Sequence, residues 1–200
     1  YFYETPKAKG IHEPGDSAVE ITVSDAWPRV NDLTLDKNGF ALRDFKTAYS
    51  EWEDEQNMRT NFYPEVVEFL QRELGAKRVL VFDHTIRTES NAKKPLTDEK
   101  NTSQRSPVML VHCDYTTESG PLRVQQLLGD EAEDLLKRRV AFINVWKPIN
   151  RIVEERPLAM CDVQTCEDSD FFKLHLRYRD RNGENYVCKV RLPTRIILGC

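Results

Sequence analysis

The chain has 200 residues, of which 40% are apolar and 31% are charged, and its formal net charge is −4. This composition is typical of one globular domain with a sizeable core, and the absence of a basic stripe argues against a nucleic-acid or anionic-membrane partner. No secretory signal or long apolar run is present, so we expect a soluble, cytoplasmic protein. The missing initiator Met indicates that residues precede Tyr1.

The first part of the chain is expected to be an arm followed by two helices. Residues 1–43 contain several Pro and Gly residues and little helical periodicity, which predicts an extended arm with short strands, such as one over 18–23. Apolar residues then recur every three or four positions and predict a helix over 44–58. A second helix is expected to begin at Pro64 and to end at Gly75, because Pro suits a first helical turn and Gly suits a C-terminal cap.

The middle of the chain alternates apolar segments with a long polar one. Residues 78–87 are apolar on both faces, which predicts a central strand that is covered twice. Residues 88–107 are polar and lack periodicity, and this loop has two interpretations, a lid over a site or a mobile segment without a role. A strand is predicted over 108–115, and Asp130 begins a capping-box pattern that predicts a helix over 131–139.

The last part of the chain is expected to be rich in strands. They are predicted over 140–146, 158–163, 171–179 and 184–190, with a hairpin turn at 180–183. Helices followed by strands predict an α+β fold in which N-terminal helices pack outside a sheet-rich barrel or sandwich. The expected organisation is an arm over 1–43, a domain over 44–190 with the loop at 88–107, and a divergent tail over 191–200.

The five cysteines are widely spread and form no C-x-x-C motif. This spacing does not indicate a disulfide scaffold or a structural zinc site, and it predicts reduced thiols. The alternative is a bridge between Cys161 and Cys166 if the chain is oxidised.

The main candidate for chemistry is the pair His112 and Asp114. Residues two positions apart on a strand point to the same face, so the imidazole and the carboxylate can converge while Cys113 faces away. Two histidines and one carboxylate on one side of the metal form the iron site of non-haem oxygenases. A short H-x-D pattern also arises by chance, and a hydrogen-bonded His beside a turn-directed Asp is the structural alternative.

Four segments, in order, carry a wider resemblance: FDHTIR (82–87), PVMLVHCDYTTESGPLR (107–123), AFINVWKPI (141–149) and PLAMCD (157–162). Together they resemble the fungal AsaB hydroxylase/desaturase family, which is similar to the small chain of the cephem methoxylase (CmcJ) and to gibberellin desaturase. The resemblance implies an oxygenase-like domain with a double-stranded β-helix core of the jelly-roll or cupin type. It also implies Fe(II) and 2-oxoglutarate as cofactors, a secondary metabolite as substrate, and His112 and Asp114 as metal ligands.

The sequence departs from this family near its end. Family members continue well beyond the segment GENYVCK and place there the distal histidine and the arginine that binds 2-oxoglutarate, whereas this chain ends with VRLPTRIILGC. The expected core is therefore incomplete. A truncated or misjoined gene product and a natural shortened paralogue are equal interpretations. His175 is a candidate third ligand, although it shares a strand face with Lys173 and Arg177, which disfavours a further cation.

Five further residues are candidates for the cofactor side of the site. The candidates are His84, Arg87, Arg123, Asn144 and Trp146. Each also has a structural interpretation. His84 can be a hydrogen-bonded core histidine, the two arginines can form surface ion pairs, and Asn144 and Trp146 can belong to a buried strand without lining a site.

The leading hypothesis is an iron-dependent oxygenase that hydroxylates or desaturates a fungal secondary metabolite. One alternative is a non-redox isomerase or cyclase, or an inactive small-molecule binder, on the same scaffold. A second is a subunit that needs a partner, in a homo- or hetero-oligomer, because an unpaired strand edge favours association. No nucleophile, P-loop or dinucleotide motif supports a hydrolase, NTPase or nicotinamide enzyme.

Overall fold

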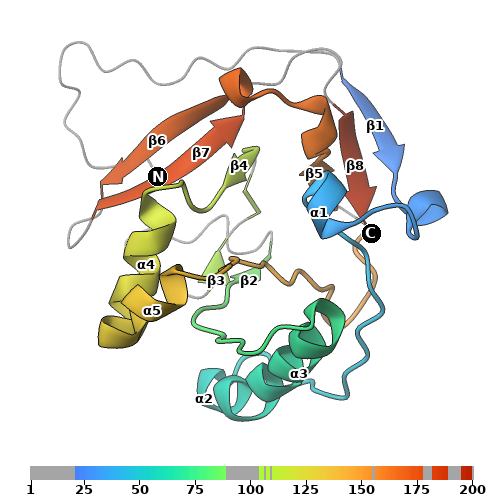
Figure 1. Cartoon of the computed structure of the whole chain (residues 1–200). Coiled ribbons are helices and arrows are strands. Elements are labelled where there is room, and N and C mark those ends of the chain that lie inside the picture. Colours follow the sequence, from blue (N-terminus) through green and yellow to red (C-terminus); the bar gives the residue numbers. More distant parts are fainter. Residues whose placement is uncertain are drawn as a thin grey trace. The chain divides into compact units, whose positions relative to one another are not determined.

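The computed structural model describes residues 21–88, 104–105, 107–108, 110–154, 156–177, 182–188 and 195–199. The chain divides into two compact units. We call the first the two-sheet unit; it contains the described residues up to Leu42, together with Leu110–Ile143 and Leu158–Gly199. The second, the helical unit, contains Arg43–Met109 and Asn144–Pro157. Figure 1 shows the elements of both. Within the described residues, no helix is both long enough and apolar enough to cross a membrane.

The first sheet of the two-sheet unit has the strand order β1–β8–β5. Its central strand, β8 (Arg195–Gly199), pairs in parallel with β1 (Thr22–Asp25) and antiparallel with β5 (Leu158–Cys161). The strand predicted over 158–163 is confirmed for its first four residues, whereas 18–20 of the strand predicted over 18–23 lie outside the described residues. The strand β8, near the end of the chain, therefore lies between β1 and β5 and is hydrogen-bonded to both (Figure 1).

A small apolar core lies against this sheet. Ile197 of β8 is completely buried and clusters with Ala26, Leu33 and Phe40. A short 3₁₀ helix, η1 (Trp27–Arg29), and the helix α1 (Leu35–Asn38) lie among these residues in the sequence. Burial of these side chains accounts for the order of a segment without long helices or strands.

The second sheet has the strand order β4–β7–β6 and is antiparallel. Its strands are β4 (His112–Cys113), β7 (Asn182–Cys188) and β6 (Phe171–Arg177). The predicted pairing of the last two strands is confirmed. The predicted Asn-Gly turn is wrong, because Asn182 pairs with Arg177 and Gly183 with Leu176 inside the ladder, while 178–181 lie outside the described residues.

Short helices connect these strands. The 3₁₀ helices η5 (Val163–Thr165) and η6 (Asp168–Asp170) lie between β5 and β6. Between β4 and β5 the chain forms α4 (Ser119–Leu128), the 3₁₀ turn η4 (Gly129–Glu131) and α5 (Ala132–Leu136). The helix predicted over 131–139 is thus shorter than expected and lacks the Asp130 cap.

The helix α4 was not predicted, since Gly and Pro are the residues least favourable to a helix and both occur in its first turn. Pro121 is the third residue of the helix, where its missing N–H leaves no intrahelical bond unmade. The helix begins where Thr116 Oγ1 accepts hydrogen bonds from the backbone N–H groups of Glu118 and Ser119, at 3.2 and 3.0 Å. The Thr116 side chain, which precedes the helix, therefore satisfies N–H groups that the helix itself leaves without partners.

The helical unit contains one continuous helix built from α2 (Glu55–Asn57), a π-helical turn η2 (Met58–Phe62) and α3 (Tyr63–Leu74). The helix predicted from Pro64 is confirmed, and Gly75 ends it with a φ of 62°. The helix predicted over 44–58 is wrong for most of its length. Residues 41–51 have no regular structure, and the helix begins only after Asp54, whose side chain accepts a hydrogen bond from the Asn57 N–H at 2.9 Å.

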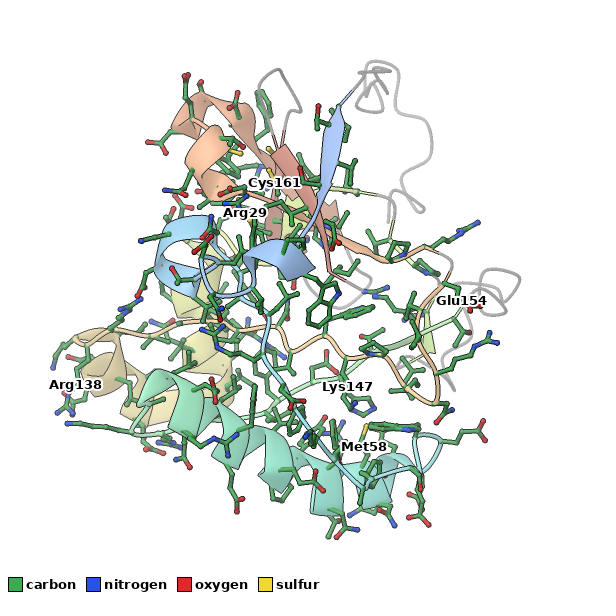
Figure 2. The ribbon with its side chains drawn as sticks, turned by 90° about the vertical axis from the view of Figure 1, so that its right-hand side faces the viewer. Arg29, Met58, Arg138, Lys147, Glu154 and Cys161 are labelled. Atoms are coloured by element: carbon green, nitrogen blue, oxygen red, sulfur yellow. The ribbon has the colours of Figure 1, made fainter. Side chains whose placement is uncertain are left out.

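The aromatic residues that suggested that first helix have another role. Phe45 stacks on Phe69 of α3 with ring centroids 4.6 Å apart, and Trp52 and Tyr49 contact Phe62 at 5.0 and 5.4 Å. Their spacing therefore reflects the packing of a segment without regular structure against η2 and α3. Met58, labelled in Figure 2, is buried in the same unit.

Two predicted strands are largely absent. Of residues 78–87, only β2 (Ile86–Arg87) is a strand, and it pairs in parallel with β3 (Gln104–Arg105); most of the predicted loop, 89–103, lies outside the described residues. Residues 140–146 form no strand. An apolar run can pack through side chains alone, as Phe142 does on Tyr115 with ring centroids 4.1 Å apart, whereas a strand also needs a hydrogen-bonding neighbour.

Candidate functional site

The candidate metal centre lies at the end of β4. His112 pairs with Val187 of β7, and Asp114 follows β4 in a bend. The Asn185 amide, in the orientation that satisfies both of its polar atoms, donates a hydrogen bond of 3.0 Å to the Asp114 carbonyl oxygen. The backbone on either side of the pair is therefore tied to β7, although β4 is shorter than the predicted strand.

The two side chains converge on one point. His112 Nε2 and Asp114 Oδ1 lie 3.2 Å apart, and the side chains are 25% and 44% exposed. Two ligands about 2.1 Å from one ion and about 90° apart would be about 3.0 Å from each other. The spacing thus suits adjacent positions in the coordination sphere of one metal ion, and the exposure leaves the pair open to solvent.

The other imidazole nitrogen fixes the orientation of the ring. His112 Nδ1 lies 2.9 Å from the Leu110 carbonyl oxygen, which can only accept a hydrogen bond. In the neutral ring this hydrogen bond places the proton on Nδ1, so that Nε2, beside the Asp114 carboxylate, carries the lone pair that can bind a cation. Histidine ligands of metals are commonly held in this way, because the backbone hydrogen bond selects the tautomer and orients the ring.

A polar network positions the turn after Asp114. Thr116 Oγ1 donates a 2.6 Å hydrogen bond to Glu184 Oε1, and Ser119 Oγ donates one of 2.9 Å to the Glu184 carbonyl oxygen. Lys173 contacts the Glu118 carboxylate at 2.7 Å, which lowers the pKa of Glu118 to about 2. This network was not predicted from the sequence, where its signal is the spacing Thr116-x-x-Ser119 before α4.

His175 lies on the opposite face of the sheet from His112. In the register of the sheet, His112 is aligned with Val187 and then with Phe172. His175 is three positions from Phe172, and an odd offset places it on the other face. There its Nδ1 lies 3.2 Å from Glu184 Oε2, so this imidazole belongs to the network behind the turn.

The remaining candidate residues are divided between the two units. Arg123, in the two-sheet unit, lies on α4, and its guanidinium contacts Gln126 at 3.3 Å. In the helical unit His84 is half-buried, and its Nδ1 forms a 2.7 Å hydrogen bond with the Tyr63 hydroxyl. Arg87 on β2 is exposed. The structure thus brings His112 and Asp114 together, while the cofactor-side residues stay predictions.

Asn144 and Trp146 lie outside regular structure in the helical unit. Both side chains are exposed, that of Trp146 by 40%. The buried strand that was expected to carry them is absent, because 140–146 form no ladder. Their place in a site therefore stays a prediction without that support.

The comparison with protein families identifies an oxidoreductase class. Residues 1–195 match the family model described as an oxidoreductase/YMDC permease-like domain, and the chain belongs to this family. Similar curated proteins include the hydroxylase/desaturase efuI of Hormonema carpetanum, 31% identical over 83% of this chain and 58% of that protein. Another is the alpha-ketoglutarate-dependent dioxygenase tstK of Talaromyces stipitatus, 29% identical over 80% of this chain and 57% of that protein.

These relatives confirm the predicted resemblance at the level of fungal hydroxylase/desaturases and alpha-ketoglutarate-dependent dioxygenases. The chain spans less than two thirds of the length of both. Among solved structures, the iron and alpha-ketoglutarate-dependent endoperoxidase NvfI matches with a TM-score of 0.71 and 19% identity, over 94% of this chain and 72% of that one. The chain therefore shares the fold of that structure.

Proposed function

We propose that this chain carries part of the active site of an Fe(II)- and 2-oxoglutarate-dependent oxygenase that hydroxylates or desaturates a small fungal secondary metabolite. The observation that carries the proposal is the convergence of His112 Nε2 and Asp114 Oδ1 at 3.2 Å, with Nδ1 anchored to the Leu110 carbonyl oxygen. The names of the relatives support the same chemistry and do not favour the isomerase or cyclase alternative.

The donor set fits iron. One imidazole nitrogen and one carboxylate oxygen are two of the three donors in the facial triad of non-haem iron oxygenases. His112 would hold the ion as a neutral ligand, and Asp114 would offset part of its charge. Bound iron would supply the activation of O₂ that oxidation of a C–H bond requires. Within β4, β7 and β6, the register brings no second histidine to the face of His112.

The residues around the pair position its two ligand side chains. The Leu110 carbonyl oxygen accepts a hydrogen bond from His112 Nδ1, so that Nε2 of the neutral ring would be the metal ligand, and the Thr116–Glu184 contact holds the turn that carries Asp114. We place Arg123 at the carboxylate of 2-oxoglutarate, since a guanidinium binds carboxylates through two hydrogen bonds. The remaining cofactor-binding candidates in this proposal are Asn144, Trp146, Arg87 and His84.

A finer assignment is part of the same proposal. We assign the chain to the AsaB-like branch of these enzymes, with a double-stranded β-helix core of which this chain holds part. The quoted segments around His112 and the name hydroxylase/desaturase of a relative support the assignment. The two small sheets supply strands of the kind that such a core requires.

The test compares two strand histidines. Fe(II) binding to anaerobic protein with 2-oxoglutarate is followed by the visible charge-transfer band, and succinate is measured after O₂ is admitted. His112→Ala is expected to weaken metal binding at least about tenfold, because substitutions around metal sites commonly cost that much or more. His175→Ala, on the other sheet face, is the control and is expected to bind as the wild type does. Equal binding by both variants would exclude the proposed centre.

A further inference from the structure

Three cysteines that are far apart in the sequence come together in the two-sheet unit. Cys161 is the last residue of β5, Cys166 follows η5, and Cys188 is the last residue of β7. Their Sγ atoms all lie within 4.8 Å of one another, and those of Cys161 and Cys166 are 3.3 Å apart. Cys161 is labelled in Figure 2. All three side chains are half-buried.

Local hydrogen bonds bring Cys166 back beside Cys161. Asp162 is buried; its carboxylate accepts hydrogen bonds from the Asn38 side chain at 3.1 Å and from the Gln164 N–H at 3.2 Å. Its carbonyl oxygen accepts one from the Thr165 hydroxyl at 2.7 Å. These contacts hold the turn of η5, so the short distance between the two sulfur atoms follows from a fixed backbone.

The third thiol belongs to the other sheet. Cys188 pairs with Phe171 across β7 and β6, and its N–H donates a 3.1 Å hydrogen bond to the Val111 carbonyl oxygen. Val111 immediately precedes His112. The cluster therefore joins β5 of the first sheet to β7 of the second, at the point where the strand of the candidate iron site begins.

We propose that Cys161, Cys166 and Cys188 form a binding site for a thiophilic divalent cation, with zinc as the probe. Thiolates in a tetrahedral zinc site bind at about 2.3 Å, which places them within about 4 Å of one another, and the cluster lies close to that arrangement. Each thiol that binds the ion loses its proton to solvent, and a fourth position remains for water or another ligand. The site is separate from the His112–Asp114 centre and does not depend on the proposed function.

The geometry of the cluster favours a shared cation over a disulfide, because three sulfur atoms lie close to one another and a disulfide joins only two. Each thiol that becomes a ligand gives up its proton when the cation binds, so binding is expected to release protons. A zinc site was not expected from the sequence, since the three cysteines form no C-x-x-C motif and only the fold of two sheets brings them together.

The experiment uses the whole chain, purified under reductant and loaded with Co²⁺ or Zn²⁺. The expected result is one equivalent of thiolate-bound metal, seen as saturation of sulfur-to-cobalt charge-transfer bands in the near ultraviolet, whatever further metal the His112–Asp114 centre binds. Cys161→Ser, Cys166→Ser and Cys188→Ser are each expected to lose these bands or to bind the metal at least about tenfold more weakly. His112→Ala is the control, because it removes a ligand of the other centre and is expected to keep the cobalt–thiolate spectrum.

Circular dichroism of the metal-free variants separates loss of binding from loss of folding. A folded serine variant that binds cobalt as the wild type does would overturn the proposal. So would a wild-type cobalt complex without thiolate bands, or a Cys161–Cys166 disulfide found by mass spectrometry in protein kept under reductant. Wild-type protein that shows the cobalt–thiolate spectrum but binds no iron would count against the proposed oxygenase and leave this cysteine site standing.

Discussion

The Thr116 hydroxyl donates a 2.6 Å hydrogen bond to Glu184 Oε1 and so ties the turn after β4 to β7. Thr116 is 5% exposed, and the same oxygen accepts hydrogen bonds from two N–H groups at the start of α4. One side chain therefore satisfies the helix N-terminus and fixes the segment that presents Asp114.

Thr116→Val is expected to lower the free energy of unfolding by about 1–3 kcal/mol, because it leaves buried polar groups without their partner. Urea unfolding measures this change. Thr117→Val is the control: Thr117 is exposed, so its substitution should change stability by no more than about 0.5 kcal/mol. Equal effects of the two substitutions would show that the buried contact does not stabilise the turn.

The tautomer of His112 can be observed directly. Because Nδ1 donates to the Leu110 carbonyl oxygen, nitrogen NMR of the metal-free protein at high pH is expected to show a protonated Nδ1 and an unprotonated Nε2. Addition of a diamagnetic cation such as Zn²⁺ should shift the Nε2 resonance and leave the proton on Nδ1. A protonated Nε2 in the neutral ring would contradict the proposed orientation of the ligand.

His84 gives the helical unit a pH-dependent stability. Burial, followed by the positive charge of Arg59, lowers the pKa of His84, so the folded state binds its proton less readily than the unfolded chain does. Stability is therefore complete above the unfolded pKa of about 6.5 and decreases as the pH falls through the lower folded value.

An NMR titration of the His84 ring checks the shift and is expected to give a midpoint below about 6.5. Unfolding measured across the same range should become less pH-dependent in His84→Gln. A midpoint above that value would show that the His84 ring, although hydrogen-bonded to Tyr63, is more easily protonated in the folded chain, and it would contradict the prediction.

Ile197 tests whether the last described strand stabilises the two-sheet unit. Its side chain is completely buried in the core cluster, so Ile197→Ala is expected to cost about 2–5 kcal/mol of unfolding free energy. Ile152→Ala is the matched control, because Ile152 is 77% exposed and its substitution should cost no more than about 0.5 kcal/mol. Guanidinium unfolding of both variants measures these free energies. If Ile197→Ala costs no more than the control, burial of Ile197 does not stabilise the two-sheet unit.

Features that depend on neighbouring residues could be predicted before the fold was known. Pro64 and Gly75 mark the confirmed helix, since a first turn tolerates Pro and a left-handed cap favours Gly. The expected hairpin predicted the pairing of β6 with β7, although Asn182 and Gly183 lie in the ladder and not in its turn. The H-x-D spacing predicted that His112 and Asp114 converge. Each of these depends on backbone geometry over a few residues, which a local pattern encodes.

The remaining features depend on contacts between distant segments. Phe45 and Trp52 have a spacing that fits a helix, yet they lie outside regular structure and pack onto Phe69 of α3 and Phe62 of η2. The opposite orientation of His175 follows from its register with β7. The meeting of Cys161 and Cys188 needs two sheets to form first. These outcomes depend on contacts between residues that are distant in the sequence. Local periodicity does not indicate which distant segment will pack against a given element.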